Sequence, residues 1–306
     1  MSSDVILEVD RLSVSFRMYE KGLEQKILRV INHLSLRVNA GEILAVAGSS
    51  GSGKSLLAHA ILGILPSNAR VSGEIRYSGE NLTPKRQQQL RGKEITLVPQ
   101  SVDYLDPLMR VGEQVRGPEG SRERQRELFR RYELDPAVED LFPFQLSGGM
   151  ARRVLLASAM IGDAKLVIAD EPTPGLSPEM AANAMSHFRD LADQGCGVLL
   201  ITHDIDLALS YADRLSVFYA GTTVETAPVE DFRRGAENLR HPYSKALWRA
   251  MPGNEFLSIP GVQPYPGSLP GGCLFAPRCE MKTAECDERP AVREVRGGEV
   301  ACCHAS

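Results

Sequence analysis

The segment GSSGSGKS, residues 48–55, restricts the possible folds of this chain more than any other segment. It fits the pattern G-x-x-x-x-G-K-S, in which glycines let the backbone curve so that its N–H groups point inward around a phosphate chain. The apolar run ILAVA before it predicts a buried strand, and SLLAHAILGIL after it has helical spacing. A strand, a glycine-rich loop and a helix in this order predict a phosphate-binding α/β unit.

Two side chains of this loop have separate predicted tasks. Lys54 can reach the β- and γ-phosphates of a bound triphosphate, and Ser55 can hold Mg²⁺. The remaining residues of the predicted phosphate cradle are Gly48, Ser49, Ser50, Gly51, Ser52 and Gly53. A glycine-rich turn without a ligand is the alternative interpretation of the same residues.

A second apolar run, KLVIADEP, ends in the acidic residues Asp170 and Glu171. Acidic residues at the carboxyl end of a buried strand face the ligand crevice of a parallel sheet. Asp170 suits the Mg²⁺ shell, and Glu171 suits a general base for an attacking water. The pair alone also fits an ordinary helix N-terminus, but the phosphate loop in the same chain favours the catalytic interpretation.

A third segment, QLSGGMARRVLLASAMIG, begins an apolar helix with a serine and two glycines. Such a start is a second potential anion site, and a single nucleotide does not need two of them. We therefore expect Ser147, Gly148 and Gly149 to hold the γ-phosphate of a nucleotide bound to a second subunit. A plain helix N-cap is the alternative.

These motifs, in this order, resemble those of the ATP-binding cassette (ABC) ATPases. Residues 48–55 match the Walker A motif, residues 146–150 match the signature LSGGQ with methionine at the last place, and residues 167–170 match the Walker B motif. Glu171 then stands at the position of the family's catalytic glutamate. The resemblance implies that the chain binds ATP with Mg²⁺ and hydrolyses it.

Other positions gain a role only from this resemblance. Gln100, in LVPQ, matches the Q-loop residue that senses Mg²⁺ and the membrane subunit, and His203, in ITHD, matches the switch histidine at the γ-phosphate. Phe16 lies where the family stacks an aromatic ring on adenine, although it also fits a core residue, and Tyr19 is a rival for the same task. Ser177 replaces the family's D-loop aspartate, so we expect altered coupling between two ATP sites, with hydrolysis affected and binding retained.

The C-terminal segments HPYSKALWRAMP, IPG and GCLFAPRC, within residues 241–306, resemble the oligopeptide/dipeptide/nickel importer ATPases. DYLDPLMRVGEQV, after Gln100, is similar to the same family. Some members hold a [4Fe–4S] cluster in this tail, and the resemblance assigns its ligands to four cysteines: Cys273, Cys279, Cys286 and Cys303.

The cysteine spacing C-x5-C-x6-C-x16-C is wider than the C-x2-C of a zinc ribbon, which favours the cluster over zinc. Zinc and metal-free thiols remain alternatives, as does Cys302 for the fourth ligand. We expect a structural or redox-sensing cluster that hydrolysis does not need.

Cys196, in DQGCGVLL, is expected to be a small buried residue beside a strand.

The expected fold is therefore an α/β, P-loop NTPase (RecA-like) ABC cassette with a mainly parallel sheet, a helical subdomain and a small cysteine-rich extension. Residues 1–83 and 161–235 are predicted to form the ATP-binding core, and residues 84–160 the helical subdomain with the Q-loop and the signature. Residues 236–306 are predicted to form the extension. Within the helical part, SRERQRELFRRYEL predicts a charged helix over a small core.

The composition, with 43% apolar residues, 24% charged residues and a net charge of −4, favours a globular protein that does not bind nucleic acid. No signal peptide or membrane span is expected.

The resemblance implies a peripheral subunit on the cytoplasmic face of the inner membrane. Its partners would be a second, different ABC ATPase subunit, two permease subunits and an extracytoplasmic solute-binding protein.

The imported solutes implied by the resemblance are dipeptides, oligopeptides or nickel-type solutes. Two alternative functions stay open on the sequence. One is a soluble ABC ATPase that acts on ribosomes or DNA, although such proteins usually have two cassettes or a long coiled coil. The other is an ATPase regulated by a metal cluster.

Overall fold

The computed structural model describes residues 5–21, 24–48, 52–118 and 120–305. The chain divides into two compact units. The first unit comprises residues 1–6, 38–43 and 83–202, and the second comprises residues 7–37, 44–82 and 203–306. The segment predicted as the helical subdomain, residues 84–160, therefore lies wholly within the first unit.

The first unit contains three parallel strands: β6 (Ile95–Val98), β7 (Leu166–Asp170) and β8 (Gly197–Thr202). β7 is the central strand of the three, and its last residue, Asp170, pairs with Ile201 of β8. Every residue of β7 and β8 is buried. Burial on both faces explains why these strands have continuous apolar sequences with no alternation.

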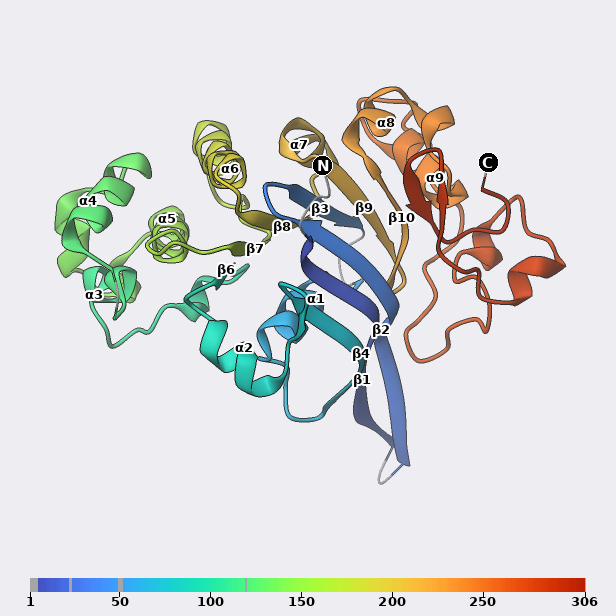
Figure 1. Ribbon diagram of the computed structural model, residues 1–306, viewed down its shortest axis with the longest axis horizontal. Helices are drawn as coiled ribbons and strands as arrows, with labels where there is room; N and C mark the ends of the chain where they lie inside the picture. The colour runs from blue at the N-terminus through green and yellow to red at the C-terminus, as the bar shows by residue number, and fades with distance from the viewer. Residues whose placement is uncertain (1–4, 22–23, 49–51, 119, 306) are drawn as a thin grey trace. The chain divides into compact units, whose positions relative to one another are not determined.

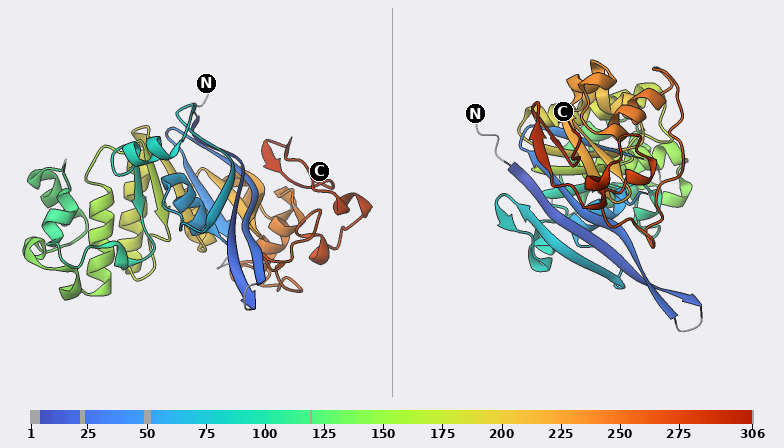
Figure 2. Two further views of the ribbon diagram at one scale, coloured as in Figure 1. Left: turned by 90° about the horizontal axis from the view of Figure 1, so that it is seen from below. Right: turned by 90° about the vertical axis from the view of Figure 1, so that its right-hand side faces the viewer.

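The helices of the first unit are α2 (Pro84–Leu90), α3 (Val111–Arg116), α4 (Arg122–Arg131), α5 (Gly148–Ala159) and α6 (Pro178–Asp193). Three short 3₁₀ turns, Val102–Tyr104, Pro136–Asp140 and Pro143–Gln145, connect them. Helices α3, α4 and α5 pack together as one group (Figures 1 and 2). α4 buries Leu128 and Phe129 and exposes most of its charged residues, which confirms the predicted amphipathic helix.

The second unit contains the antiparallel sheet β2–β1–β4–β5. Its long strands β1 (Val5–Lys21) and β2 (Glu24–Asn39) run side by side, with β4 (Ala69–Tyr77) and β5 (Glu80–Asn81) beyond β1 (Figures 1 and 2). A second group of strands has the order β11–β12–β10–β9–β3. These strands are β3 (Ile43–Gly48), β9 (Arg214–Tyr219), β10 (Thr222–Pro228), β11 (Arg293–Val295) and β12 (Gly298–Val300).

Within this second group, β3 and β9 are parallel, and the remaining pairs are antiparallel. The helices of the unit are α1 (Lys54–Leu62), α7 (Ile205–Tyr211), α8 (Val229–Arg233) and α9 (Pro242–Ala250). Short 3₁₀ turns cover Ala236–Asn238, Ala276–Arg278 and Ala284–Asp287. The C-terminal tail thus joins the second unit through the hydrogen bonds of β12 to β10.

A buried ion network holds β12 and the turn before it against β10. The guanidinium of Arg240 is 1% exposed and lies 3.3 Å from Glu225 and 2.7 Å from Asp231. It also donates to the carbonyls of Val295 and Arg296, at 2.5 Å each. One side chain therefore binds two carboxylates and two backbone carbonyls, and it neutralises the fully buried Glu225.

Candidate functional site

The phosphate loop connects β3 to α1 in the second unit, as predicted. At Gly48, an added Cβ would lie 2.4 Å from the Phe218 carbonyl oxygen, so only glycine fits. Gly53 has φ 97°, in the left-handed region, and caps the start of α1. The ammonium of Lys54 donates to the Gly48 carbonyl at 2.8 Å, so the cation is held across the loop.

The other predicted nucleotide residues of the second unit have varied surroundings. Ser49, Ser50 and Gly51 lie outside the described residues. Ser52 is buried, Ser55 stands in the first turn of α1, and His203 is exposed directly after β8. Phe16 is half-buried in β1, opposite Ala69 of β4, and Tyr19 is 66% exposed.

The carboxyl end of β7 carries the two predicted acidic residues in the first unit. Asp170 is 3% exposed and Glu171 is 7% exposed. Glu171 has φ 48°, a left-handed conformation that costs free energy in any residue with a side chain. Its N–H nevertheless donates to the Ile201 carbonyl at 2.9 Å, which fixes the strained backbone. Such strain is concentrated at functional sites.

Arg152, a residue to which the sequence analysis gave no role, links three predicted motifs within the first unit. It lies on α5, is 7% exposed, and donates to the Pro99 carbonyl at 2.7 Å and to the Gln100 carbonyl at 2.5 Å. Burial lowers the pKa of Arg152, whereas the negative charges of Asp170 and Glu171 act in the opposite direction. The guanidinium therefore binds the Q-loop backbone and is influenced by the charges at the acidic end of β7.

The start of α5 is exposed and has room for a side chain. Ser147 caps the helix by accepting from the Met150 N–H at 3.3 Å. Gly148 is exposed, its φ is not in the left-handed region, and an added Cβ would meet no heavy atom within 4 Å. The described chain therefore gives no internal reason for glycine at this helix start.

Ser177, at the predicted D-loop position, caps α6 by accepting from the Met180 N–H at 3.3 Å. Serine and aspartate are comparable N-caps, so the helix start does not require the family's aspartate. The substitution therefore changes the charge at this place and leaves the local fold satisfied.

Two cysteines of the tail, Cys286 and Cys303, meet beside His304 within the second unit. Cys286 Sγ lies 3.6 Å from Cys303 Sγ and 3.5 Å from His304 Nε2, and Thr283 Oγ1 lies 3.0 Å from the same ring nitrogen. Burial is the main cause of the raised pKa values of the Cys273 and Cys279 thiols, and the neighbouring cysteines also contribute. The ligand atoms of Cys286, Cys303 and His304 all lie within 4.8 Å of one another, close enough to hold one metal ion.

The two neighbouring cysteines 302 and 303 differ in their surroundings. Cys302 packs with Val300 and Ala305 in a small apolar cluster, and burial raises its pKa to about 11. Cys303 is half-exposed and faces Cys286. Cys196 is 6% exposed, which confirms the prediction of a small buried residue.

The predicted nucleotide residues thus fall into two groups. Gln100, Asp170 and Glu171, with Arg152, lie together in the first unit, which also carries the start of α5. Lys54, Ser55 and His203 belong to the second unit.

Among the helices that the structure describes, none combines the length and apolar character that crossing a bilayer requires.

Two family profiles match separate parts of the chain. The family described as "ABC transporter" matches residues 31–174, and the family described as "Oligopeptide/dipeptide transporter, C-terminal region" matches residues 224–286. The first match contains the phosphate loop, the start of α5 and the acidic end of β7. The second contains α9 and the first three tail cysteines.

Individual proteins and structures are similar over most of the chain. The dipeptide transport ATP-binding protein DppD of Escherichia coli is 35% identical over 98% of this chain and 96% of its own length. The oligopeptide transport ATP-binding protein OppD of Mycobacterium tuberculosis is 34% identical over 97% of this chain and 51% of its own length. A dimeric structure of the ATP-binding cassette MJ0796 with ADP and Pi matches with a TM-score of 0.64 and 25% identity, over 73% of this chain and 99% of that one.

Proposed function

Because this chain belongs to the ABC transporter family, as an ATP-binding subunit of the oligopeptide and dipeptide importers, we propose that it hydrolyses ATP to drive uptake of short peptides. Its proposed partners are a second, different ATPase subunit, two permease subunits and an extracytoplasmic solute-binding protein. Its proposed place is the cytoplasmic face of the inner membrane. The names of the relatives favour peptides over nickel-type solutes.

The proposed roles at the nucleotide follow from the surroundings of each residue. The phosphate loop binds the triphosphate through backbone N–H groups, with Lys54 against the β- and γ-phosphates. Glu171 orients the attacking water and accepts its proton, and His203 contacts the γ-phosphate. Phe16 is the proposed stacking partner of adenine.

The donors proposed for Mg²⁺ are oxygen atoms, which this hard cation prefers. The Asp170 carboxylate at the buried end of β7 fits that preference, as do the hydroxyl of Ser55 and the side chain of Gln100. Bound there, the ion would neutralise charge that develops on the transferred phosphoryl group. Gln100 has its backbone fixed by Arg152, which restricts where its side chain can reach.

The observation that carries the proposal is an exposed glycine at the start of α5 that has free space where a side chain would stand. The fold of the chain does not require a residue as small as glycine at position 148. Yet Gly148 begins a helix, and the N–H groups at a helix start favour an anion. We infer that Ser147, Gly148 and Gly149 complete the nucleotide site of a second cassette. Two cassettes would then close head to tail around two nucleotides, and hydrolysis would reopen them.

The test is ATP hydrolysis by the importer assembled in proteoliposomes with its permeases, partner ATPase and binding protein. Peptide-loaded binding protein is expected to stimulate phosphate release, and a nickel chelate is not. Gly148→Ala is expected to lower the stimulated rate on the order of 10²-fold, by blocking a backbone donor at the partner's phosphate.

Gly162→Ala is the matched control, because its added Cβ also meets no heavy atom within 4 Å. Both variants should keep the melting temperature of the parent chain, which separates an effect on the partner's site from misfolding. Peptide-independent turnover, or full activity of Gly148→Ala, would contradict the proposal.

For the tail, we propose a [4Fe–4S] cluster held by Cys273, Cys279, Cys286 and Cys303. The contact between the soft thiol donors of Cys286 and Cys303 fits part of such a group, and the apolar packing of Cys302 favours Cys303 as the fourth ligand. When bound, the cluster would supply a structural link with redox activity, and the cysteines would fix its position. His304 approaches Cys286 and makes a mononuclear zinc site the alternative.

Anaerobic iron and sulfide reconstitution of the purified chain tests the ligand assignment. The parent chain is expected to bind about four iron atoms with broad visible absorption. Cys286→Ser should lose both signals, and Cys302→Ser, the control beside the proposed fourth ligand, should retain them. Binding of stoichiometric zinc without iron would refute the assignment. So would loss of iron and visible absorption in Cys302→Ser together with their retention in Cys303→Ser.

A further inference from the structure

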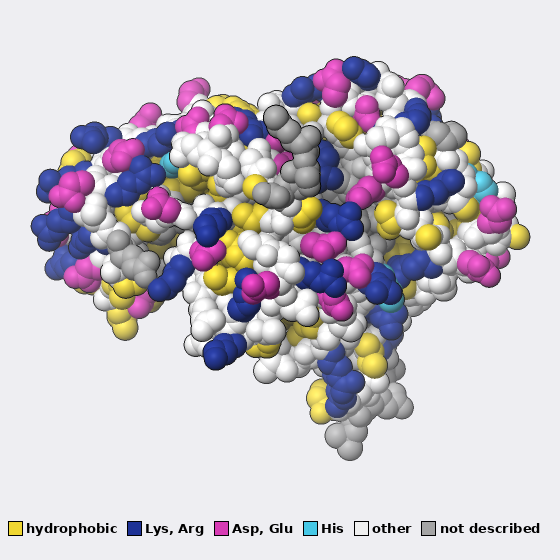
Figure 3. All heavy atoms as spheres, viewed as in Figure 1, with side chains coloured by type: hydrophobic (Ala, Val, Ile, Leu, Met, Phe, Trp, Pro, Cys, Tyr) yellow, Lys and Arg dark blue, Asp and Glu magenta, His cyan; other side chains and the backbone are white. Residues whose placement is uncertain are grey.

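A charged cavity lies within the second unit, lined by none of the residues assigned to the nucleotide. Its volume is about 720 Å³. One wall comes from β1, β2 and β4, and the other comes from β10 and from residues 289–301 of the tail. On the face shown in Figure 3, Lys, Arg, Asp and Glu side chains gather over β1, β2 and β4.

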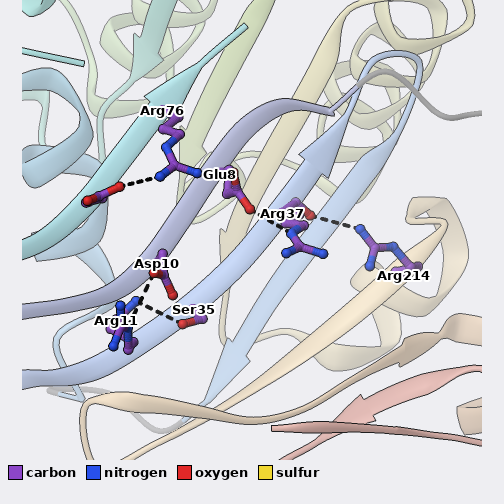
Figure 4. Close-up of polar contacts among 8 residues, drawn as sticks. Glu8, Asp10, Arg11, Ser35, Arg37, Arg76 and Arg214 are labelled. Atoms are coloured by element: carbon purple, nitrogen blue, oxygen red, sulfur yellow. Dashed lines mark hydrogen bonds and ion pairs between the residues drawn. The ribbon is translucent and has the colours of Figure 1, made fainter. Parts of the chain in front are cut away.

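The charges on the strand wall largely pair with one another. Glu8 lies 3.0 Å from Arg37 and 3.3 Å from Arg76, and Asp10 lies 3.3 Å from Arg11 (Figure 4). These pairs leave little net charge along the middle of the cavity. A ligand would therefore be recognised mainly by charges elsewhere on the lining.

One end of the cavity is acidic. Glu294 and Glu299 stand directly opposite each other in the β11–β12 pair, and both line the cavity. Two like charges in opposed positions destabilise a strand pair. Neither carboxylate lies within 4.0 Å of a Lys, Arg or His nitrogen among the residues that the structure describes. A bound cation would relieve this repulsion.

The other end is basic. His33 and Arg289 line it, and Arg289 donates to the Asn32 side-chain oxygen at 3.2 Å and to the Asn32 carbonyl at 3.3 Å. Partial burial and the nearby charges of Arg289, Arg29 and Arg11 lower the pKa of His33. Three guanidinium groups therefore act on one ring, and no carboxylate within the described chain forms an ion pair with Arg289.

Strand β10 gives the separation of the two ends. The hydroxyl of Thr222 lies 3.5 Å from the His33 carbonyl, and Thr226 pairs with Glu299. Because β10 has a bulge between Thr223 and Glu225, the step from Thr222 to Thr226 matches only three residue steps of β9, from Tyr219 to Ser216, and spans about 10 Å. An extended peptide covers at most about 3.3–3.6 Å per residue, so three or four residues bridge this distance.

We propose that this cavity binds a zwitterionic peptide of three or four residues, with its terminal ammonium at Glu294 and Glu299 and its carboxylate at His33 and Arg289. The inference rests on the proposed function, because peptide import supplies such molecules to the compartment of this chain. The site would report imported peptide to the ATPase from a position outside the nucleotide site. A simple anion or a simple cation would use only half of it.

Isothermal titration calorimetry of the full chain with trialanine tests this proposal. Trialanine is expected to bind saturably, and N-acetyl-trialanine and trialanine amide at least tenfold more weakly. Glu299→Gln should weaken trialanine binding but leave the acetylated peptide unaffected. Arg289→Gln should weaken trialanine binding but leave the amide unaffected. Glu113→Gln, an exposed glutamate of α3, is the matched control and should bind like the parent.

Absence of saturable heat would overturn the proposal, as would equal affinity for free and blocked peptides. Inorganic phosphate that binds as tightly as trialanine, with sensitivity only to Arg289→Gln, would show an anion site and also overturn it. The same protein is then assembled into the importer for ATPase assay. Normal peptide-stimulated hydrolysis without peptide binding to the isolated chain would refute this inference alone, whereas loss of that stimulation would count against the proposed function.

Discussion

Replacing Glu171 with glutamine is expected to lower ATP turnover by about 10²–10⁴-fold while leaving ATP binding intact. This is the usual contribution of a positioned general base. Glutamine has the same shape and can adopt the same backbone conformation, but its amide cannot accept a proton from water. Because nucleotide closure would no longer be followed by hydrolysis, the variant should accumulate as a closed cassette dimer with trapped ATP.

The measurements are phosphate release from the assembled importer, equilibrium dialysis with labelled ATP, and the mass of the ATP-bound species. Glu179→Gln is the control, because it makes the same chemical change on an exposed residue in the first turn of α6. It should retain full turnover. An unchanged rate in Glu171→Gln would show that another group activates the water.

Replacing Arg240 with alanine is expected to cost about 3–5 kcal/mol of unfolding free energy in the second unit, the range for breaking a buried ion pair from one side. The change leaves Glu225, which is fully buried, without its guanidinium partner. It also leaves the carbonyls of Val295 and Arg296 without donors. The β11–β12 hairpin should detach before the rest of the unit unfolds.

Urea unfolding measures the total loss, and hydrogen exchange of residues 293–300 locates it. Arg234→Ala is the matched control, because Arg234 is 63% exposed and its ion pair with Glu230 spans 3.5 Å. An exposed pair of this kind contributes about 0–1 kcal/mol. Equal stability of the two variants, or unchanged exchange in residues 293–300, would mean that Arg240 does not hold the tail.

Local signals in the sequence predicted the elements that carry the phosphate loop and the acidic strand. The apolar run before Gly48 and the helical spacing after Ser55 correspond to β3 and α1. The run before Asp170 corresponds to β7, and the serine–glycine start corresponds to α5 with Ser147 as its cap. These signals worked because each element is specified by its own apolar pattern and its own capping residue.

The contacts of buried cations could not be predicted in the same way. Arg152 lies on the same side of α5 as Leu155 and Leu156, and an arginine in an apolar stripe signals a buried partner without identifying it. That partner, the backbone of Pro99 and Gln100, is about 50 residues away in sequence. Arg240 likewise meets carbonyls more than 50 residues later. Pairings of this range depend on tertiary packing, which local patterns do not encode.

The hydrogen bonds of Arg152 have a mechanical consequence. A helix turn is stiff, and two short bonds to consecutive carbonyls leave the guanidinium little freedom to rotate. A shift of α5 when the opposing cassette docks would therefore displace the peptide plane of Gln100 in the same direction. If the Q-loop contacts a permease, as in the family, then docking of the opposing cassette at one ATP would move α5. Arg152 would pass this movement to the Q-loop, and the Q-loop would pass it to the membrane subunit.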